Sequence, residues 1–241
     1  PFINDSIDGK IINTTTNKKD LCESAIKWYL YPIIKNQLEL EFEDDLVNCN
    51  NIEDLHDSSS YKRKVNFYKW AANTFEENMI ISNKLPFDKS PDWDKEYMFT
   101  NEEIDTIKDS FNKNEFICVK IPVPIHEIKG KKYYGSFRVC IHKDINLTKS
   151  EDEFIRGGLL IPDMNTLRSY PGYRVAIIID QDDPLNNFLV KAEGPAHRFW
   201  STDRAIKDFY KYSQATIDFV KRSAKRIIRY SESEYETVDT E

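Results

Sequence analysis

The sequence predicts an α+β fold, with strands and helices alternating as in α/β proteins, built on a mixed β-sheet that carries helices mainly on one face. Two stretches with apolar residues at every second position, 117–125 and 133–141, indicate the strands of a hairpin. The β-branched run at 173–180 is typical of a strand buried on both faces. Helical spacing then predicts a helix over 184–192 and a long C-terminal helix over 203–230.

Local signals predict the elements near the N-terminus. Asp20 is expected to cap a helix, because its carboxylate would accept from the free N–H groups of the first turn, and Pro32 is expected to kink or end that helix. Period-two alternation over 38–42 and a short run at 46–49 then predict two strands joined by a turn at Asp44.

The middle of the chain favours helices. Apolar residues at helical spacing over 61–81 predict one helix, and Thr100 with Glu103 forms a capping box that begins another. Pro122 and Pro124 cannot donate to a β-ladder, so the first hairpin strand is expected near a sheet edge.

These signals divide the chain into four segments. They are an N-terminal linker, helix and β-hairpin (1–57), a helical insertion (58–114), a β-α-β core (115–202), and a basic C-terminal helix with an acidic tail (203–241).

Composition indicates a globular protein of the cytoplasm. Hydrophobic residues make up 40% and charged residues 31% of the 241 residues, and no apolar run reaches the roughly 18 residues of a membrane span. Cys22, Cys49, Cys118 and Cys140 lie too far apart for a zinc or disulfide framework, which favours a reducing compartment. Because the chain begins at Pro1 and not at Met, we interpret it as a segment of a longer protein.

The chain lacks the short motifs that bind nucleotides. It contains neither a G-x-x-x-x-G-K-[ST] phosphate loop nor a G-x-G-x-x-G turn, so the segment alone is not expected to bind ATP. Glu127 and Lys129 form an E-x-K pattern downstream of Asp92, as in metal-dependent nucleases, but a solvated strand end explains the same residues.

Basic residues gather near the C-terminus although the net charge is −7. Spacing of three and four places the cations of this cluster on one side of the predicted helix: Lys221, Arg222, Lys225, Arg226 and Arg229. Such a face is suited to phosphates or to a partner subunit, and a solvated helix face remains the alternative.

Two further stretches each have a functional and a structural interpretation. A cation on the loop 143–153 would be able to reach a phosphate across a domain boundary, or the loop is an ordinary charged surface. His197 and Trp200 follow a helix stop at Gly194, and packing against the core is the favoured role for both.

Three stretches carry a family resemblance. They are the opening Pro1–Ile3 with the helix and strand of 28–41, the stretch Phe154–Ile161, and the stretch Ala192–His197 with Trp200. In their order, they resemble the region that follows the nucleotide-binding domain in GHKL-superfamily ATPases, such as MutL, MORC proteins and related heat-shock chaperones. The large GHKL ATPases of bacterial anti-phage, restriction-like systems are the nearest likeness, and the block 58–114 has no counterpart.

The resemblance implies a transducer segment that relays nucleotide state to dimer closure. It implies one cation for the γ-phosphate, with Lys149 as the first candidate and Arg156 as the second. ATP and Mg²⁺ would be bound mainly outside this segment, by a nucleotide-binding domain in the same chain. The implied partners are a second copy, DNA, and helicase or nuclease subunits, and the full-length protein is expected to hydrolyse ATP.

Two alternatives stay open. The first is an interaction module that binds nucleic acid or protein with no link to a nucleotide. The second is a metal-dependent nuclease domain.

Overall fold

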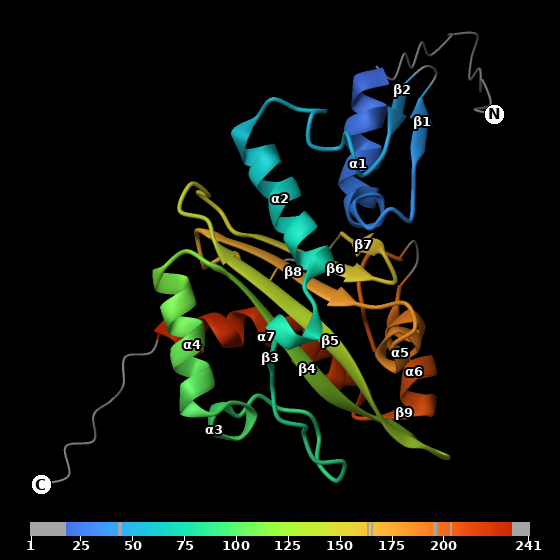
Figure 1. Ribbon diagram of the computed structural model, residues 1–241. Helices are drawn as coiled ribbons and strands as arrows, with labels where there is room; N and C mark the ends of the chain where they lie inside the picture. The colour runs from blue at the N-terminus through green and yellow to red at the C-terminus, as the bar shows by residue number, and fades with distance from the viewer. Residues whose placement is uncertain are drawn as a thin grey trace, which may run out of the picture.

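The computed structural model describes residues 18–42, 45–162, 164, 166–194, 197–202 and 204–232 (Figure 1). In chain order the elements are α1 (Lys18–Ile34), β1 (Leu40–Phe42), β2 (Asp45–Val47), α2 (Ser59–Asn73), the 3-10 turn η1 (Glu76–Asn78), β3 (Ile80–Ile81), α3 (Lys95–Met98), α4 (Asn101–Asn112), β4 (Phe116–Glu127), β5 (Lys132–Lys143), β6 (Glu151–Arg156), β7 (Leu159–Ile161), β8 (Tyr173–Ile179), α5 (Pro184–Ala192), α6 (Arg204–Phe209), β9 (Tyr210–Lys211) and α7 (Ser213–Glu232). Each helix of these residues is too short or too polar to cross a bilayer. The predicted N-terminal linker, the acidic tail and Asp44 lie outside the described residues.

The main sheet is mixed, which confirms the predicted α+β class. Its strands follow the order β3-β4-β5-β8-β6-β7, and β9 pairs with β4. The pairs β4–β5 and β5–β8 are antiparallel, whereas β3–β4 and β6–β8 are parallel. A β-α-β core was expected, but the chain passes from β6 to β8 through the hairpin strand β7, and the helix α5 comes only after β8.

Alternate residues of the strands enter two separate cores. Val139 and Ile177 point into the larger core, which α4, α5 and α7 also line. Cys140 and Ile178 point to the opposite face, where α1 and α2 cover the sheet. In Figure 1, α7 lies behind the sheet and α2 in front of it. Most helices therefore pack on one face, as predicted, and α1 with α2 forms a second layer that the strand pattern did not indicate.

The edge position predicted for β4 is confirmed around its prolines. On its outer side, β3 pairs with Val119 and Lys120, and β9 pairs with His126 and Glu127. Pro122 and Pro124 fall between these two short strands, where β4 has no outer partner in the described part of the chain. The missing N–H groups of proline are tolerated at such a gap.

The turn between β6 and β7 depends on two glycines. Arg156 pairs directly with Leu159, so the loop contains only Gly157 and Gly158. Both have positive φ, 55° and 86°, as a two-residue hairpin turn of the primed type requires.

The predicted helix over 61–81 is wrong beyond residue 73. Thr74 is extended, and the side chain of Phe75 is 69% exposed although it continues the apolar spacing. Ile80 instead pairs with Val119 in the sheet. The segment 58–114 therefore supplies a strand to the sheet as well as helices, because pairing with β4 outweighs the local helical pattern.

The single helix predicted over 203–230 is also wrong. The chain forms α6, then β9, then α7, and Tyr212 adopts a positive φ of 57° between the last two. Tyr210 pairs with Glu127, and the Ile128 N–H donates to the Phe209 carbonyl at 2.8 Å. These tertiary hydrogen bonds interrupt the helical pattern.

Helix starts are predicted with mixed success. Thr100 and Glu103 form the expected capping box, and the Asp183 side chain caps α5 in front of Pro184. Asp20 is not an N-cap, because α1 already begins at Lys18. The same helix continues two residues past Pro32 before it ends.

A close approach between β5 and α5 makes Gly135 sensitive to substitution. A Cβ at this position would lie 2.7 Å from the Leu185 nitrogen and 2.8 Å from the Asp183 carboxylate. We expect Gly135→Ala to lower the free energy of unfolding by about 1–3 kcal/mol in urea denaturation, because the Leu185 backbone and the capping Asp183 side chain have to move. Gly130→Ala is the matched control: its Cβ meets only the flexible end of Glu127, and we expect a change below about 0.5 kcal/mol. Equal unfolding midpoints for the two variants would contradict this reading.

Candidate functional site

The loop between β5 and β6, residues 144–150, is anchored at its first residue. The buried Asp144 carboxylate accepts from Arg63 Nε at 3.1 Å and from the Arg174 guanidinium at 3.3 Å. It also accepts from the Asn146 N–H at 3.1 Å, which closes a local turn. Burial alone would raise the pKa of Asp144, but these hydrogen bonds outweigh it and lower that pKa. The carboxylate is therefore charged and fixed.

The other end of the loop is anchored by Ser150. Its hydroxyl donates to the Tyr170 carbonyl and accepts from the Tyr173 N–H at 2.9 Å. Between the two anchors, Lys149 is exposed, and among the described residues it forms no ion pair. The fold therefore presents a lysine ammonium on a loop whose ends are both held by polar contacts.

Arg156 lies at the opposite end of β6, about 20 Å from Lys149 for a strand of this length. Its guanidinium is buried and engages both carboxylate oxygens of Glu193, the second at 3.1 Å. It also donates to Asn186 Oδ1 at 2.9 Å. The two alternative candidates for the phosphate cation therefore lie in different surroundings: Lys149 is exposed, and Arg156 is held inside the protein.

Of the two residues expected to pack against the core after α5, Trp200 does and His197 does not. The His197 side chain is 68% exposed, and its Nδ1 contacts the same Glu193 carboxylate that binds Arg156. Trp200 is buried, with its ring edge-on to Phe154 at a centroid distance of 5.6 Å. Trp200 therefore stabilises the region where β6 meets the end of α5, and the prediction of core packing is wrong for His197.

The five basic residues of α7 lie on its outer side, because its apolar residues face the larger core. Lys221 donates to the Trp200 carbonyl at 2.8 Å, and burial lowers its pKa. Arg229 Nε donates to the Tyr170 hydroxyl at 2.7 Å, and Lys225 lies over the same ring at 5.7 Å. Arg222 is exposed. We refer to Lys221, Arg222, Lys225, Arg226 and Arg229 as the α7 cationic face.

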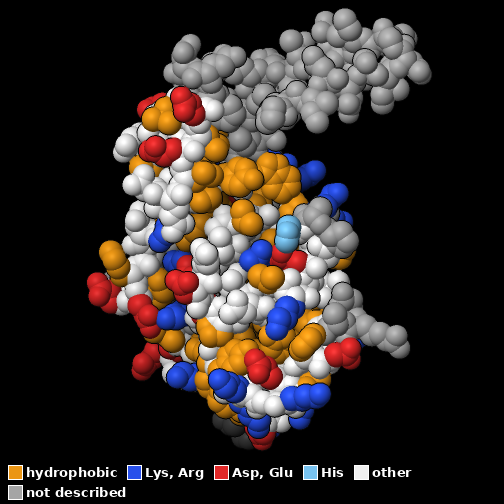
Figure 2. Space-filling model, turned by 90° about the vertical axis from the view of Figure 1, so that its right-hand side faces the viewer, with side chains coloured by type: hydrophobic (Ala, Val, Ile, Leu, Met, Phe, Trp, Pro, Cys, Tyr) orange, Lys and Arg blue, Asp and Glu red, His pale blue; other side chains and the backbone are white. Residues whose placement is uncertain are grey.

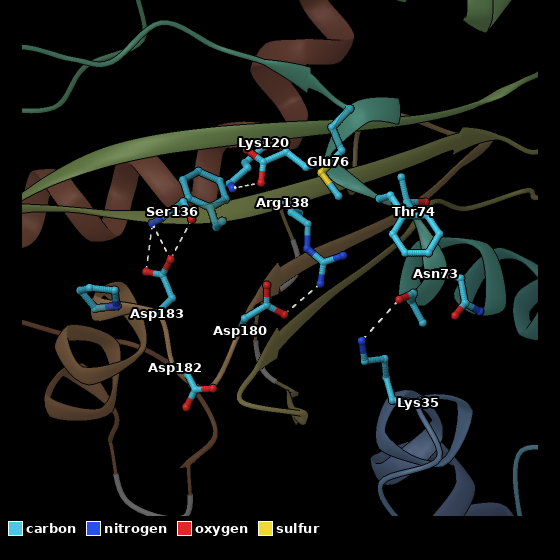
Figure 3. Close-up of a pocket in the computed structure, with 15 residues that line it drawn as sticks. Lys35, Asn73, Thr74, Glu76, Lys120, Ser136, Arg138, Asp180, Asp182 and Asp183 are labelled. Carbon is cyan, nitrogen blue, oxygen red and sulfur yellow. Dashed lines mark hydrogen bonds and ion pairs between the residues drawn. The ribbon is translucent and has the colours of Figure 1, made fainter.

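A cavity of about 710 Å³ opens between the end of α2, strand β5 and the turn that follows β8 (Figure 3). Arg138 and Asp180 point toward one another there, and their ion pair is 2.9 Å long. Arg138 also donates to the Ala71 carbonyl at 3.2 Å and to the Tyr31 hydroxyl at 3.1 Å. Burial raises the pKa of Tyr31 to about 12, so this hydroxyl stays protonated.

Arg138 was missed by the sequence reasoning. A cation at an even position of the apolar hairpin strand was the available signal, since the covered second face would then require a partner for it. Its contacts join α1, α2 and the turn after β8, so it fixes the second helix layer to the sheet.

The residues of the nuclease interpretation have other contacts. Glu127 accepts from the Tyr133 hydroxyl at 3.2 Å, Lys129 is exposed in the β4–β5 turn, and Asp92 accepts from the Trp93 N–H at 2.8 Å. Within the described ranges, no group of three or more His, Cys, Asp or Glu side chains is arranged to hold a metal ion.

The face that carries β7, α5 and α6 mixes charges of both signs with apolar side chains (Figure 2). Val190, on α5, and Phe209, at the end of α6, are among its exposed apolar residues. In this view, basic and acidic side chains are interspersed, and neither sign forms a continuous patch.

The buried position of Arg156 predicts a large effect for its partner. Glu193→Gln would leave the guanidinium buried beside a neutral amide, and we expect a loss of about 3 kcal/mol in the free energy of unfolding, measured in urea. Glu76→Gln is the matched control, because Glu76 pairs with Lys120 at a carboxylate that is 63% exposed. There we expect a loss below about 1 kcal/mol. Similar losses of unfolding free energy in both variants would show that the Arg156–Glu193 ion pair does not stabilise the fold.

The comparisons with known proteins leave the function to be inferred from this geometry. No protein-family model, curated protein or solved structure matches the sequence.

Proposed function

We propose that this chain is the transducer segment of a larger GHKL-type ATPase of the cytoplasm, which acts in DNA-directed anti-phage defence. It relays the nucleotide state to dimer closure and to contact with DNA or a partner subunit. In the full-length protein, ATP and Mg²⁺ bind mainly on a nucleotide-binding domain outside this segment. The supporting observation is Lys149, exposed without an ion pair among the described residues on a loop anchored at Asp144 and Ser150.

An anchored loop suits a cation that acts on a phosphate. A charge already held in position loses little freedom when the phosphate arrives, so more of the attraction remains to stabilise developing negative charge. Lys149 meets this requirement better than Arg156, because the Arg156 guanidinium is already neutralised by Glu193. We therefore assign the γ-phosphate contact to Lys149 and a structural role to Arg156.

The anchors of the loop also provide a route for the relay. Asp144 is tied to Arg63 on α2 and to Arg174 on β8. On the same helix, Lys64, which follows Arg63, and Tyr68 both contact Glu153 on β6. A displacement of the Lys149 loop would thus pull on α2, and through it on the helix layer of the second face.

A second candidate function is an interaction module with no nucleotide link. The α7 cationic face favours it, because Tyr170 holds Lys225 and Arg229 side by side at the surface. Cations arranged along one helix face can neutralise several consecutive phosphates, or pair with an acidic partner.

The γ-phosphate assignment is tested in the complete gene product. Lys149→Ala is expected to lower the kcat of ATP hydrolysis at least tenfold while the Kd for ATP changes little, since the lost contact forms mainly in the transition state. Lys89→Ala, which removes an exposed loop lysine elsewhere, is the control and should leave kcat unchanged. Undiminished turnover in Lys149→Ala would remove the assignment, and absence of any ATP binding would remove the ATPase proposal.

Nucleic-acid binding is tested by charge reversal on α7. The double variant Lys225→Glu and Arg226→Glu is expected to weaken binding to double-stranded DNA and to flatten the dependence of log K on log salt. The double variant Lys129→Glu and Lys131→Glu changes the net charge equally at the exposed β4–β5 turn and serves as the control. Binding that falls equally in both variants would point to net charge alone and would contradict a specific role for this face.

A further inference from the structure

We propose that Cys118 and Cys140 are a redox-active dithiol that closes to a disulfide between β4 and β5 under a two-electron oxidant such as hydrogen peroxide. The two residues are directly opposite one another in the antiparallel register. Their sulfur atoms are 3.3 Å apart, with the Cys140 thiol donating to the Cys118 sulfur. The inference is independent of the proposed function.

The sheet already holds the backbone at the spacing that a disulfide needs. Opposite residues of an antiparallel pair have Cα atoms about 4.5 or 5.5 Å apart, and disulfides span Cα separations of about 4.4–6.8 Å. Closing the sulfurs from 3.3 Å to a bond of about 2 Å therefore requires side-chain rotation and little backbone movement. Cys49 has other contacts, since its thiol donates to Asn36 Oδ1 at 3.4 Å.

The surroundings of the pair distinguish the two sulfurs. The hydrogen bond from Cys140 lowers the pKa of Cys118, and the nearby positive charge of Arg138 acts in the same direction. Burial raises the pKa of Cys140. Cys118 is therefore the better nucleophile, because the thiolate is the reacting form.

The reaction balances with the peroxide as the only added reactant. The Cys118 thiolate attacks one peroxide oxygen, the O–O bond breaks, and the departing hydroxide takes a proton to give water and a Cys118 sulfenic acid. The Cys140 sulfur then loses its proton and attacks the Cys118 sulfur, the S–O bond breaks, and a second water leaves. The two sulfurs supply two electrons, and the peroxide oxygens accept them.

Access to the pair depends on the second helix layer. Both cysteines are buried in the core formed with α1 and α2, where Ile33 and Phe67 are their neighbours in the same cluster. A small oxidant reaches the sulfurs only when this layer opens, so the pair is expected to react slowly in the native protein and to keep the strands tied once oxidised. The bond would also stabilise the fold, because it restricts the unfolded chain.

The experiment uses the full chain. The protein is incubated with hydrogen peroxide, the remaining thiols are alkylated in denaturant, and the peptides are mapped by mass spectrometry. We expect a Cys118–Cys140 linked peptide that dithiothreitol removes, with Cys22 and Cys49 not joined to either residue. The oxidised protein should have a higher Tm than the reduced protein, and the Cys140→Ser variant should not show this increase.

Cys49→Ser is the matched control, because it removes a thiol and keeps the pair, so both the linked peptide and the increase in Tm should persist. Peptide mapping of the unmodified sequence does not depend on whether the Cys140→Ser variant folds. Recovery of Cys118 and Cys140 as free thiols, as sulfinic acids or in other pairings after prolonged oxidation would overturn the proposal.

Discussion

Burial of both faces of strand β8 is the constraint on which the rest of the structure depends. All seven residues of the strand are buried, and a fully buried Val or Ile side chain contributes about 1.5–3 kcal/mol. A strand of this kind requires neighbours on both edges and a helix layer on both faces. β5 and β6 supply the edges, α4, α5 and α7 cover one face, and α1 with α2 covers the other.

Buried arginines join the layers that this constraint creates. Arg138 ties β5 to both helices of the second face, and Arg174 ties β8 to the loop before β6 through Asp144. Arg156 joins β6 to the end of α5 on the other face through Glu193. Because a buried charge without its partner is costly, these contacts fix where the layers sit in a way that apolar packing alone does not. The anchored Lys149 loop is a product of the same network.

The Lys149 loop and the proposed dithiol are both linked to the helix layer of α1 and α2. Arg63, at the start of α2, is tied to the Lys149 loop, while Phe67 and Ala71 further along the helix belong to the core that covers the cysteines. Movement of α2 relative to the sheet would therefore change both the position of the loop and the access to the sulfur atoms. A layer held by polar contacts at its rim and by apolar contacts at its centre is suited to such a coupled displacement.

The sequence by itself determined the hairpin of β4 and β5, the buried strand β8 and the capped starts of α4 and α5, because each depends on a local period or on a residue that caps within a few positions. It also indicated the outer side of α7 on which the cations lie. Only the tertiary structure decided that helix α2 ends at Asn73 although the apolar spacing continues, and that β9 interrupts the C-terminal helix, since both result from pairing with the distant strand β4. The same holds for Arg156 and Lys149, which look alike as loop-side cations in the sequence. Whether a cation is neutralised by a buried carboxylate or left exposed is set by long-range contacts that no local pattern encodes.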